Sequence, residues 1–251
     1  MRSRSPKRSR DDANFDPFDF TMMLSVIIPT YNEAKTIVQV IDAIHSLDVG
    51  METEIIVVND GSTDETAEIL EANSRQKKNV KVFTHAENLG KGKALKTGLS
   101  HCTGTFVIIQ DADLEYSPAD YPQLLEPLVS GKASVVYGSR FIDKTISHMP
   151  LGHSIGNRLL TFLSNLLNGC RLTDMETGYK AFRREVASGF TLNSNRFSIE
   201  AEITAKIARR KFQIHEVPIH YRSRTYAEGK KLSWKDGVLT VFPIFWYRFF
   251  D

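Results

Sequence analysis

The sequence has few cysteines and no long apolar run. Only Cys102 and Cys170 occur among 251 residues, without a C-x-x-C pair, which argues against a disulfide framework or zinc ribbon and favours a reducing compartment. The longest strongly apolar stretch without a charge, at 237–247, has 11 residues, whereas a membrane-spanning helix needs about 20. The N-terminus lacks the apolar segment of a secretory signal. We expect a cytoplasmic protein with no transmembrane helix and no signal peptide.

An excess of charge of either sign is also missing. Lys and Arg total 32 against 30 Asp and Glu, so the net charge is +2, which excludes a globally basic nucleic-acid coat and an acidic disordered chain. The first ten residues, MRSRSPKRSR, are the exception, with five positive charges. Because this composition buries little apolar surface, we expect residues 1–22 to form a disordered basic tail. A patch for acidic lipid or nucleic acid is the alternative, although no nucleic-acid partner is expected.

The remaining chain, 23–251, alternates short apolar runs with amphipathic segments. In the front half, 23–138, the runs predict strands at 24–28, 54–58, 80–83, 105–109 and 133–138, and the segments between them predict helices at 37–44, 64–74, 90–101 and 118–130. In the back half, 139–251, we expect a helix at 151–167, a loop at 173–182, a helix at 199–210, a strand at 212–221, a polar loop at 222–231 and a last helix. This alternation predicts a single α/β domain with a mainly parallel sheet flanked by helices.

Polar clusters follow four of the predicted strands. They are PTYNE (29–33), NDGSTD (59–64), HAENLGKGKA (85–94) and QDADLE (110–115). Open parallel sheets bind ligands outside the carboxyl ends of their strands, so these clusters predict one site. No Gly-Lys pair is followed by Ser or Thr, and no G-x-G-x-x-G occurs, which excludes a Walker loop and a dinucleotide fingerprint.

Four charged residues of these clusters suggest the chemistry of the site. Asp111 and Asp113 are two carboxylates one residue apart at a strand end, which suits Mg²⁺ or Mn²⁺ shared with substrate phosphates; a turn or helix cap is the alternative. Lys91 follows a glycine and could neutralise a phosphate or begin a solvated helix. The segment at Asp60 has a structural interpretation, which is an Asx turn at Asp60-Gly61 followed by a helix cap at Ser62 or Thr63. In addition, the Asp60 carboxylate could accept hydrogen bonds from a base or ribose.

Taken together, the motifs resemble a known family. SVIIPTYNE, IIVVNDGSTDET, ENLGKGKALKTG and QDADLEY are similar to the nucleotide-sugar-binding half of the family-two inverting glycosyltransferases, which have the GT-A fold. GSRF (138–141), TDMETGYKAF (173–182) and EVPIHYRSRTYAEGKKLSWKDG (216–237) resemble the dolichyl- and polyprenyl-phosphate sugar transferases. The resemblance covers about residues 23 to 237. It implies a hexosyltransferase with a nucleotide-sugar donor, a polyprenyl-phosphate acceptor and Mg²⁺ or Mn²⁺ as cofactor.

The resemblance also implies roles for individual residues. Asp113, Arg140, Arg224 and Asp174 are the candidate catalytic residues, and Asp111, Asp113 and Glu115 the candidate metal ligands. Arg140, Arg224 and Arg158 are the candidates for binding the acceptor phosphate. Donor binding is implied for Pro29, Tyr31, Glu33, Asp60, Lys91 and Asp111. Asn59 departs from the family, which often has Asp there, and leaves the choice between uridine and guanosine open. The membrane-spanning tail of some relatives is also missing.

The acceptor's chemistry separates three hypotheses. A lipid phosphate is already anionic and needs arginines rather than a base. A hydroxyl acceptor of a glycan or small molecule needs a carboxylate base, for which Asp174 and Glu176 are available; helix capping or pairing with Arg140 is their alternative role. A non-catalytic nucleotide-sugar-binding module is the third hypothesis, against which the Asp111 and Asp113 pair argues.

The C-terminal segment is rich in aromatic residues. The run 232–250 has few charges and contains Trp234, Phe242, Phe245, Trp246, Tyr247, Phe249 and Phe250. Such residues favour the bilayer interface, so we expect peripheral contact with the cytoplasmic membrane face. The alternative is that they cover the apolar back of the domain.

Overall fold

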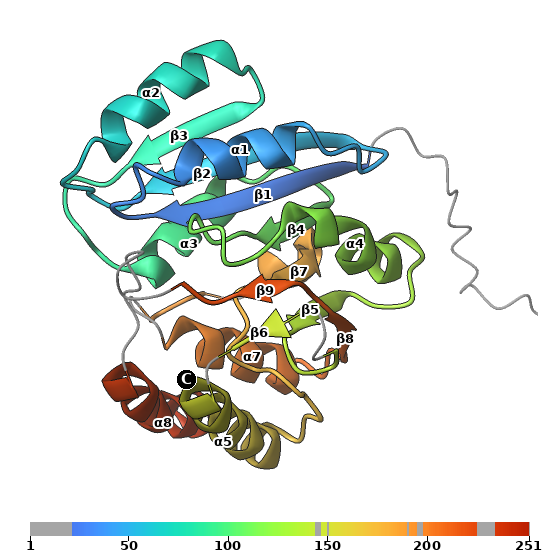
Figure 1. The fold of residues 1–251 in the computed structure, drawn as a ribbon. Coiled ribbons are helices and arrows are strands. Elements are labelled where there is room, and N and C mark those ends of the chain that lie inside the picture. The colour runs from blue at the N-terminus through green and yellow to red at the C-terminus, as the bar shows by residue number, and fades with distance from the viewer. Residues whose placement is uncertain are drawn as a thin grey trace, which may run out of the picture.

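The computed structural model describes residues 22–143, 147–149, 151–189, 191–194, 198–224 and 234–250, without the side chains of 147–148 and 234–240. The predicted tail, apart from Met22, and the predicted loop beyond Arg224 lie outside the described residues. The rest is built around one sheet, with helices on both faces (Figure 1).

The sheet has seven strands in the order β3-β2-β1-β4-β7-β5-β8. Their bounds are β1 Met23–Thr30, β2 Glu52–Asn59, β3 Val80–Thr84, β4 Phe106–Ile109, β5 Val135–Ser139, β7 Lys180–Arg183 and β8 Ile214–Pro218. β7 runs antiparallel to both neighbours, and every other pair in this sheet is parallel. A small second sheet pairs β6 (Ser147–His148) with β9 (Tyr221–Arg222). The architecture confirms the predicted single α/β fold with a mainly parallel sheet.

The central strands are apolar on both faces because helices cover both. From β1, Leu24, Val26 and Ile28 join one core, and Ile27 joins the other, as expected from side chains that alternate across a strand. The first core is shared with α1 (Ile37–His45), α2 (Thr66–Gln76) and α4 (Tyr121–Val129), which follows the 3-10 turn η1 (Pro118–Asp120). On the other face lie α3 (Lys91–His101), α5 (Leu151–Asn168), α6 (Arg184–Ala187), α7 (Ile199–Arg209) and α8 (Trp234–Phe249).

Two predictions of local structure for the back half are wrong. Residues 173–182 are not all loop, because 180–182 belong to β7, which pairs with β4 and β5. The predicted strand 212–221 is divided between β8 and β9, which lie in different sheets. Within the described residues, no helix is long and apolar enough to cross a membrane. Both cysteines are free thiols.

Candidate active site

The parallel strands bring the polar clusters to one edge of the sheet. Thr30 is paired with Asn59, and Asn59 with Thr84, so β1, β2 and β3 end side by side. Beyond these ends lie the segments that contain Tyr31 and Asp60, and the segment with Asp111 follows β4, the other neighbour of β1. This edge is therefore the one at which the sequence predicted a ligand site.

Asp60 organises the loop that leads into α3. Its side chain is buried, and its carboxylate accepts hydrogen bonds from the backbone N–H of Leu89 (3.1 Å) and of Gly90 (2.7 Å) and contacts His85 Nδ1 at 2.7 Å. Gly61, at φ +65°, lies against this loop, where a β-carbon would be 2.3 Å from the backbone of Glu87. Asp60 thereby determines where α3 begins. Its contact with a nucleoside stays a prediction.

The turn after β2 differs in detail from the prediction. Asn59, not Asp60, accepts the hydrogen bond that closes the turn, from the backbone N–H of Ser62 at 3.1 Å. Helix α2 begins at Thr66, whose N–H donates to Asp64 Oδ1 at 3.1 Å. The helix cap predicted at Ser62 or Thr63 is therefore wrong, because the N-cap position of α2 is Glu65, which makes no capping hydrogen bond with its side chain.

Three further candidate donor-binding residues lie near the end of β1, with Pro29 inside the strand and Tyr31 and Glu33 on the loop that follows it. Pro29 and Tyr31 are half-buried, whereas Glu33 is buried and accepts hydrogen bonds from Arg224 Nη1 (3.1 Å) and Nη2 (3.3 Å). Residues 33 and 224 are 191 positions apart in the chain. The back half thus contributes a cation to the polar edge of the front half.

Asp111, Asp113 and Glu115 each have cationic or hydroxyl partners. Lys91 Nζ lies 2.8 Å from Asp111 Oδ1, and Arg224 Nη2 donates to Asp113 Oδ2 at 3.0 Å. The carboxylate of Glu115 accepts from the backbone N–H of Arg224 at 2.8 Å and from the hydroxyl of Tyr221 at 2.7 Å. Burial, then repulsion from Asp111 and Glu115, raises the pKa of Asp113 to about 7. Added positive charge would therefore be favourable here.

These carboxylates fit a divalent cation that is shared with a substrate. Their oxygens are the hard donors that Mg²⁺ and Mn²⁺ prefer. Within the part of the chain that the structure describes, no three acidic, histidine or cysteine side chains converge on one point. A site of one or two carboxylates suits Mg²⁺, which commonly completes its shell with water and substrate phosphates.

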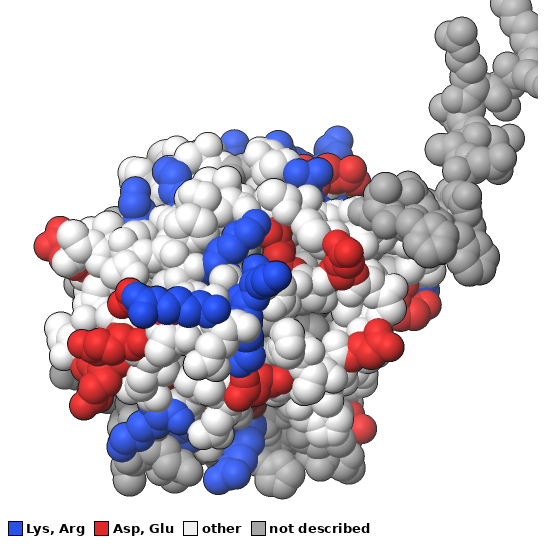
Figure 2. Space-filling model, turned by 90° about the horizontal axis from the view of Figure 1, so that it is seen from above, with Lys and Arg blue, Asp and Glu red and all other residues white. Residues whose placement is uncertain are grey.

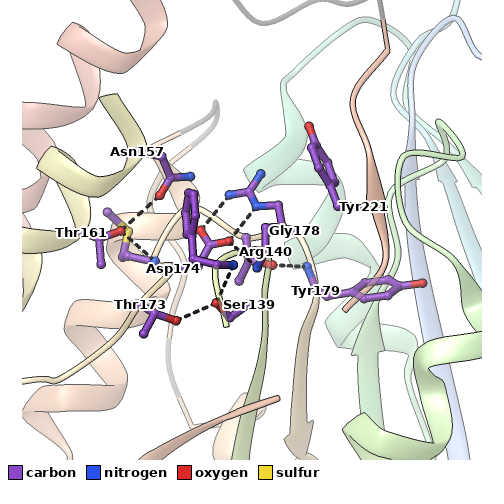
Figure 3. A network of polar contacts seen from close by, with 12 residues as sticks. Ser139, Arg140, Asn157, Thr161, Thr173, Asp174, Gly178, Tyr179 and Tyr221 are labelled. Carbon is purple, nitrogen blue, oxygen red and sulfur yellow. Dashed lines mark hydrogen bonds and ion pairs between the residues drawn. The ribbon is translucent and has the colours of Figure 1, made fainter. Parts of the chain in front are cut away.

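Arg140 and Asp174 form a buried pair beyond the end of β5 (Figure 3). Arg140 donates from Nε (2.7 Å) and from the backbone N–H (3.1 Å) to Asp174 Oδ2, and from Nη2 to Asp174 Oδ1 at 2.8 Å. Its guanidinium carbon lies 5.1 Å from the ring centre of Tyr221, the residue that also donates to Glu115. Of the three roles considered for Asp174 (general base, helix cap and partner of Arg140), the structure shows the pairing with Arg140. Arg158 is exposed and lies over Phe141, at 4.9 Å from the ring centre.

Glu176 is the second acidic residue of this loop. Its Oε1 is buried and has no hydrogen-bond partner among the described residues. Burial, then repulsion from Glu200, raises the pKa of Glu176 to about 7. A carboxyl group with this pKa can exchange a proton near neutral pH.

Two residues of this region were missed by the sequence analysis. Lys180 is fully buried on β7, where its ammonium contacts Glu200 and the backbone carbonyl of Thr177. Glu200, at the start of α7, also accepts from Lys91 Nζ at 3.0 Å. The sequence offered one signal for Lys180, which is a lysine within the otherwise apolar segment GYKAF (178–182) and should therefore need a buried carboxylate partner. The sequence does not show which carboxylate that is.

A family model identifies the chain. Residues 25–190 match the model of glycosyl transferase family 2, which is about two thirds of the chain. The chain belongs to glycosyl transferase family 2. It is therefore a glycosyltransferase, as the resemblance implied, and the match includes every strand-end cluster of the candidate site as well as Arg140 and Asp174.

Named relatives match most of this glycosyltransferase. The UDP-N-acetylglucosamine–dolichyl-phosphate N-acetylglucosaminyltransferase of Methanococcus voltae is 31% identical, over 89% of this chain and 94% of that protein. The dolichol-phosphate mannosyltransferase of Pyrococcus furiosus is also 31% identical, over 83% of this chain but 59% of that longer protein. Among solved structures, glucosyl-3-phosphoglycerate synthase of Mycobacterium tuberculosis, in complex with Mn²⁺ and UDP, has a TM-score of 0.69 at 22% identity, over 97% of this chain and 86% of that chain. At that identity the likeness shows the shared fold alone.

Proposed function

We propose that this glycosyltransferase moves a hexose from a nucleoside-diphosphate sugar, of the GDP-mannose or UDP-glucose type, to a polyprenyl or dolichyl phosphate with inversion. The observation that carries the proposal is the placement of Arg140 and Arg224. Arg224 lies against Asp113 at the donor edge, and Arg140 lies over the ring of Tyr221, whose hydroxyl donates to Glu115 at the same edge. The two archaeal relatives, a dolichyl-phosphate N-acetylglucosaminyltransferase and a dolichol-phosphate mannosyltransferase, support the same class of acceptor.

A phosphate acceptor suits the pairing of Arg140 with Asp174. A lipid phosphate is ionised at neutral pH and needs no base. It needs positive charge to overcome repulsion from the donor's diphosphate, and arginine binds phosphate through a planar fork. Asp174, fully buried and engaged by three donors of Arg140, orients that fork and is not available to deprotonate a hydroxyl.

The donor's diphosphate would lie against the Asp111 and Asp113 edge. Mg²⁺ or Mn²⁺ held there by Asp111 and Asp113 would stabilise the charge that develops on the leaving diphosphate. Lys91, at the start of α3, adds positive charge on the same side. Asp60 holds the loop before Lys91, and Pro29, Tyr31 and Glu33 would contact the nucleoside.

A donor-by-acceptor screen tests the proposal. Purified protein with Mn²⁺ or Mg²⁺ is given UDP- and GDP-sugars and either a short-chain polyprenyl phosphate or the matching polyprenol. We expect transfer to the phosphate and none to the alcohol, with an inverted anomeric configuration in the product by NMR. Arg140→Lys and Arg224→Lys should raise the acceptor KM about tenfold or more, and Arg75→Lys on distant α2 serves as control. Transfer to the alcohol alone would overturn the proposal.

Transfer to a hydroxyl is the second candidate, and Glu176 favours it. Its buried Oε1, which has no hydrogen-bond partner in the described part of the chain, and a pKa of about 7 are properties of a general base. In that case Glu176→Gln would abolish turnover with a soluble alcohol acceptor. With a phosphate acceptor, the same variant should retain most of its activity.

We further propose that the enzyme reaches its lipid acceptor by peripheral contact through α5 and α8. The two helices pack against each other (Figure 1). Together with Phe250, which directly follows α8, they expose large apolar side chains, with exposed fractions from 38% to 76%: Leu151, Ile155, Leu159, Phe162, Leu166, Val241, Phe242, Phe245, Trp246, Phe249 and Phe250. We call this surface the apolar platform. The other end of the molecule, seen from above in Figure 2, has side chains of both charges across it.

The distribution of residues on α5 is evidence for contact with lipid. Most of its buried residues are polar, and its large apolar side chains are on the exposed side. Asn157, Thr161 and Ser164 are buried toward the protein, while Leu159 and Phe162 face outward. Thr161 accepts from the backbone N–H of Met175, next to Asp174, so the inner face of α5 supports the acceptor-phosphate region. A phosphate at Arg140 would thus lie on one side of α5 while the other side faces lipid.

A further inference from the structure

A row of alternating charges extends from Asp111 into the back half of the protein. Lys91 Nζ lies between Asp111 Oδ1 (2.8 Å) and Glu200 Oε1 (3.0 Å), and Glu200 Oε2 contacts Lys180. Lys180 is fully buried and also lies 4.7 Å from the ring centre of Tyr137. Lys91 and Glu200 are 109 positions apart in the chain, so only the tertiary structure brings them together.

The dipole of α7 stabilises the charge of Glu200, whereas the dipole of α3 destabilises the charge of Lys91. Glu200 lies in the first turn of α7, where the partial positive charge of the helix N-terminus favours a carboxylate. Lys91 is the first residue of α3, where the same partial charge disfavours an ammonium. The side chain of Lys91 is only 18% exposed, so water stabilises it little. Asp111 and Glu200 are therefore what holds this cation in place.

We propose that Glu200 is a positioning residue for the donor site, which acts through Lys91 to adjust how strongly Asp111 attracts a divalent cation. The inference rests on the proposed function. When Lys91 is shared between two carboxylates, it neutralises only part of the negative charge of Asp111. The rest of that charge can attract the metal that binds the diphosphate. Without the charge of Glu200, Lys91 would keep Asp111 as its one carboxylate partner among the residues that the structure describes, and would compete with the metal for it. Lys180, bound to the other oxygen of Glu200, limits how far Glu200 can draw Lys91 away.

Mn²⁺ binding to the full chain, measured by calorimetry or by the EPR signal of free Mn²⁺, tests this inference without turnover. Glu200→Gln should weaken Mn²⁺ binding by about threefold or more, because a nearby negative charge is lost. Lys91→Met should strengthen binding by a similar factor, because a competing cation is lost. These opposite shifts are not expected of two residues that merely stabilise the fold.

The same helix offers a matched control. Glu202 is fully buried on α7 and is paired with Lys206 at 2.8 Å, but its oxygens accept from the backbone N–H groups of Asn193 and Ser194. Glu202→Gln should leave Mn²⁺ affinity unchanged. Glu200→Asp, which keeps the charge, should restore most of the affinity lost in Glu200→Gln.

The outcomes separate this inference from the proposed function. If the wild-type protein binds no Mn²⁺ even with a nucleoside diphosphate present, the metal-dependent function is wrong. If wild type binds Mn²⁺ but Glu200→Gln and Lys91→Met shift the affinity in the same direction or not at all, the positioning role alone is overturned. Should Glu200→Gln fail to fold, Lys91→Met still tests the inference, because an unchanged or weaker Mn²⁺ affinity in Lys91→Met would overturn it.

Discussion

At the scale of single residues, Gly178 shows how closely the sheet edge at Asp111 is packed. A β-carbon at this position would lie 2.2 Å from Asp111 Oδ2 and 3.0 Å from the ring of Tyr116. The backbone N–H of Gly178 also donates to the hydroxyl of Tyr116 at 2.9 Å. The back half thereby packs directly against the Asp111 carboxylate, and only glycine leaves room for it.

Gly178→Ala should therefore displace Asp111. We expect metal-dependent turnover to fall by about tenfold or more and the free energy of unfolding to fall by about 1–3 kcal/mol, as in other overpacked sites. Kinetics with a water-soluble acceptor and urea denaturation measure the two effects. Gly156→Ala on α5, where no atom lies within 4 Å of the added carbon, is the matched control. Equal turnover of both variants would contradict the packing argument.

Glu54 gives a prediction for the dependence of stability on pH. Burial raises its pKa, but hydrogen bonds from Lys81, Ser25 and Thr103 outweigh burial and lower the pKa from 4.5 to about 2. Because the pKa is depressed in the folded state, this stabilisation is present above pH 4.5 and is lost as the pH falls toward 2. The shift corresponds to at most about 3–4 kcal/mol, at about 1.36 kcal/mol per pKa unit.

Urea denaturation between about pH 7 and pH 2.5 checks this prediction. Wild type should lose more unfolding free energy over this range than Glu54→Gln, which should already be less stable at neutral pH. Glu71→Gln, at an exposed site paired with Arg75 on α2, should lose as much on acidification as wild type. An identical slope for Glu54→Gln and wild type would refute the assignment to Glu54.

At the scale of secondary-structure elements, α5 and α8 depart from the usual amphipathic arrangement. Helices of globular proteins turn their apolar face toward the core, whereas α5 buries Asn157, Thr161 and Ser164 and leaves large apolar side chains exposed. The alternative considered for the C-terminal aromatics was that they cover the back of the domain. It holds for Tyr247, which is buried, but not for Phe242, which is 68% exposed.

Charged substitutions on the apolar platform test its contact with lipid. Leu159→Glu with Phe162→Glu should abolish co-flotation of the full-length protein with anionic liposomes, because two carboxylates would have to enter the interface. Gln39→Glu with Ala72→Glu adds the same charge to exposed positions of α1 and α2 and should leave flotation intact. Turnover with a short, water-soluble acceptor should survive in both variants. If the platform variant still floats, the lipid contact lies elsewhere.

At the scale of the whole molecule, the two halves of the sequence share one sheet. The back-half strand β7 lies between β4 and β5, the last two strands of the front half. Ion pairs also join the halves, from Lys91 to Glu200 and from Arg224 to Glu33. The residues that we propose to bind donor and acceptor are thus parts of one folding unit.

The protein should accordingly unfold in one step. We expect coincident urea transitions by far-UV circular dichroism and tryptophan fluorescence for the full chain. A fragment of residues 22–138 should be aggregated or largely unfolded, since it lacks β7 and leaves the edges of β4 and β5 unpaired. Gel filtration and circular dichroism of the fragment measure this. A soluble, cooperatively folded fragment would contradict a shared folding unit.

The sequence by itself determined the alternation of strands and helices in the front half and the edge at which its polar clusters meet. Those features follow from local periodicity and from the rule that parallel strands end together, which need no knowledge of distant contacts. Only the tertiary structure decided that Glu200 contacts both Lys91 and Lys180 and that Arg224 contacts Glu33. It also decided that α5 exposes large apolar side chains. Each of these depends on residues far apart in the chain, whose pairing is set by the packing of the whole sheet and not by any local pattern.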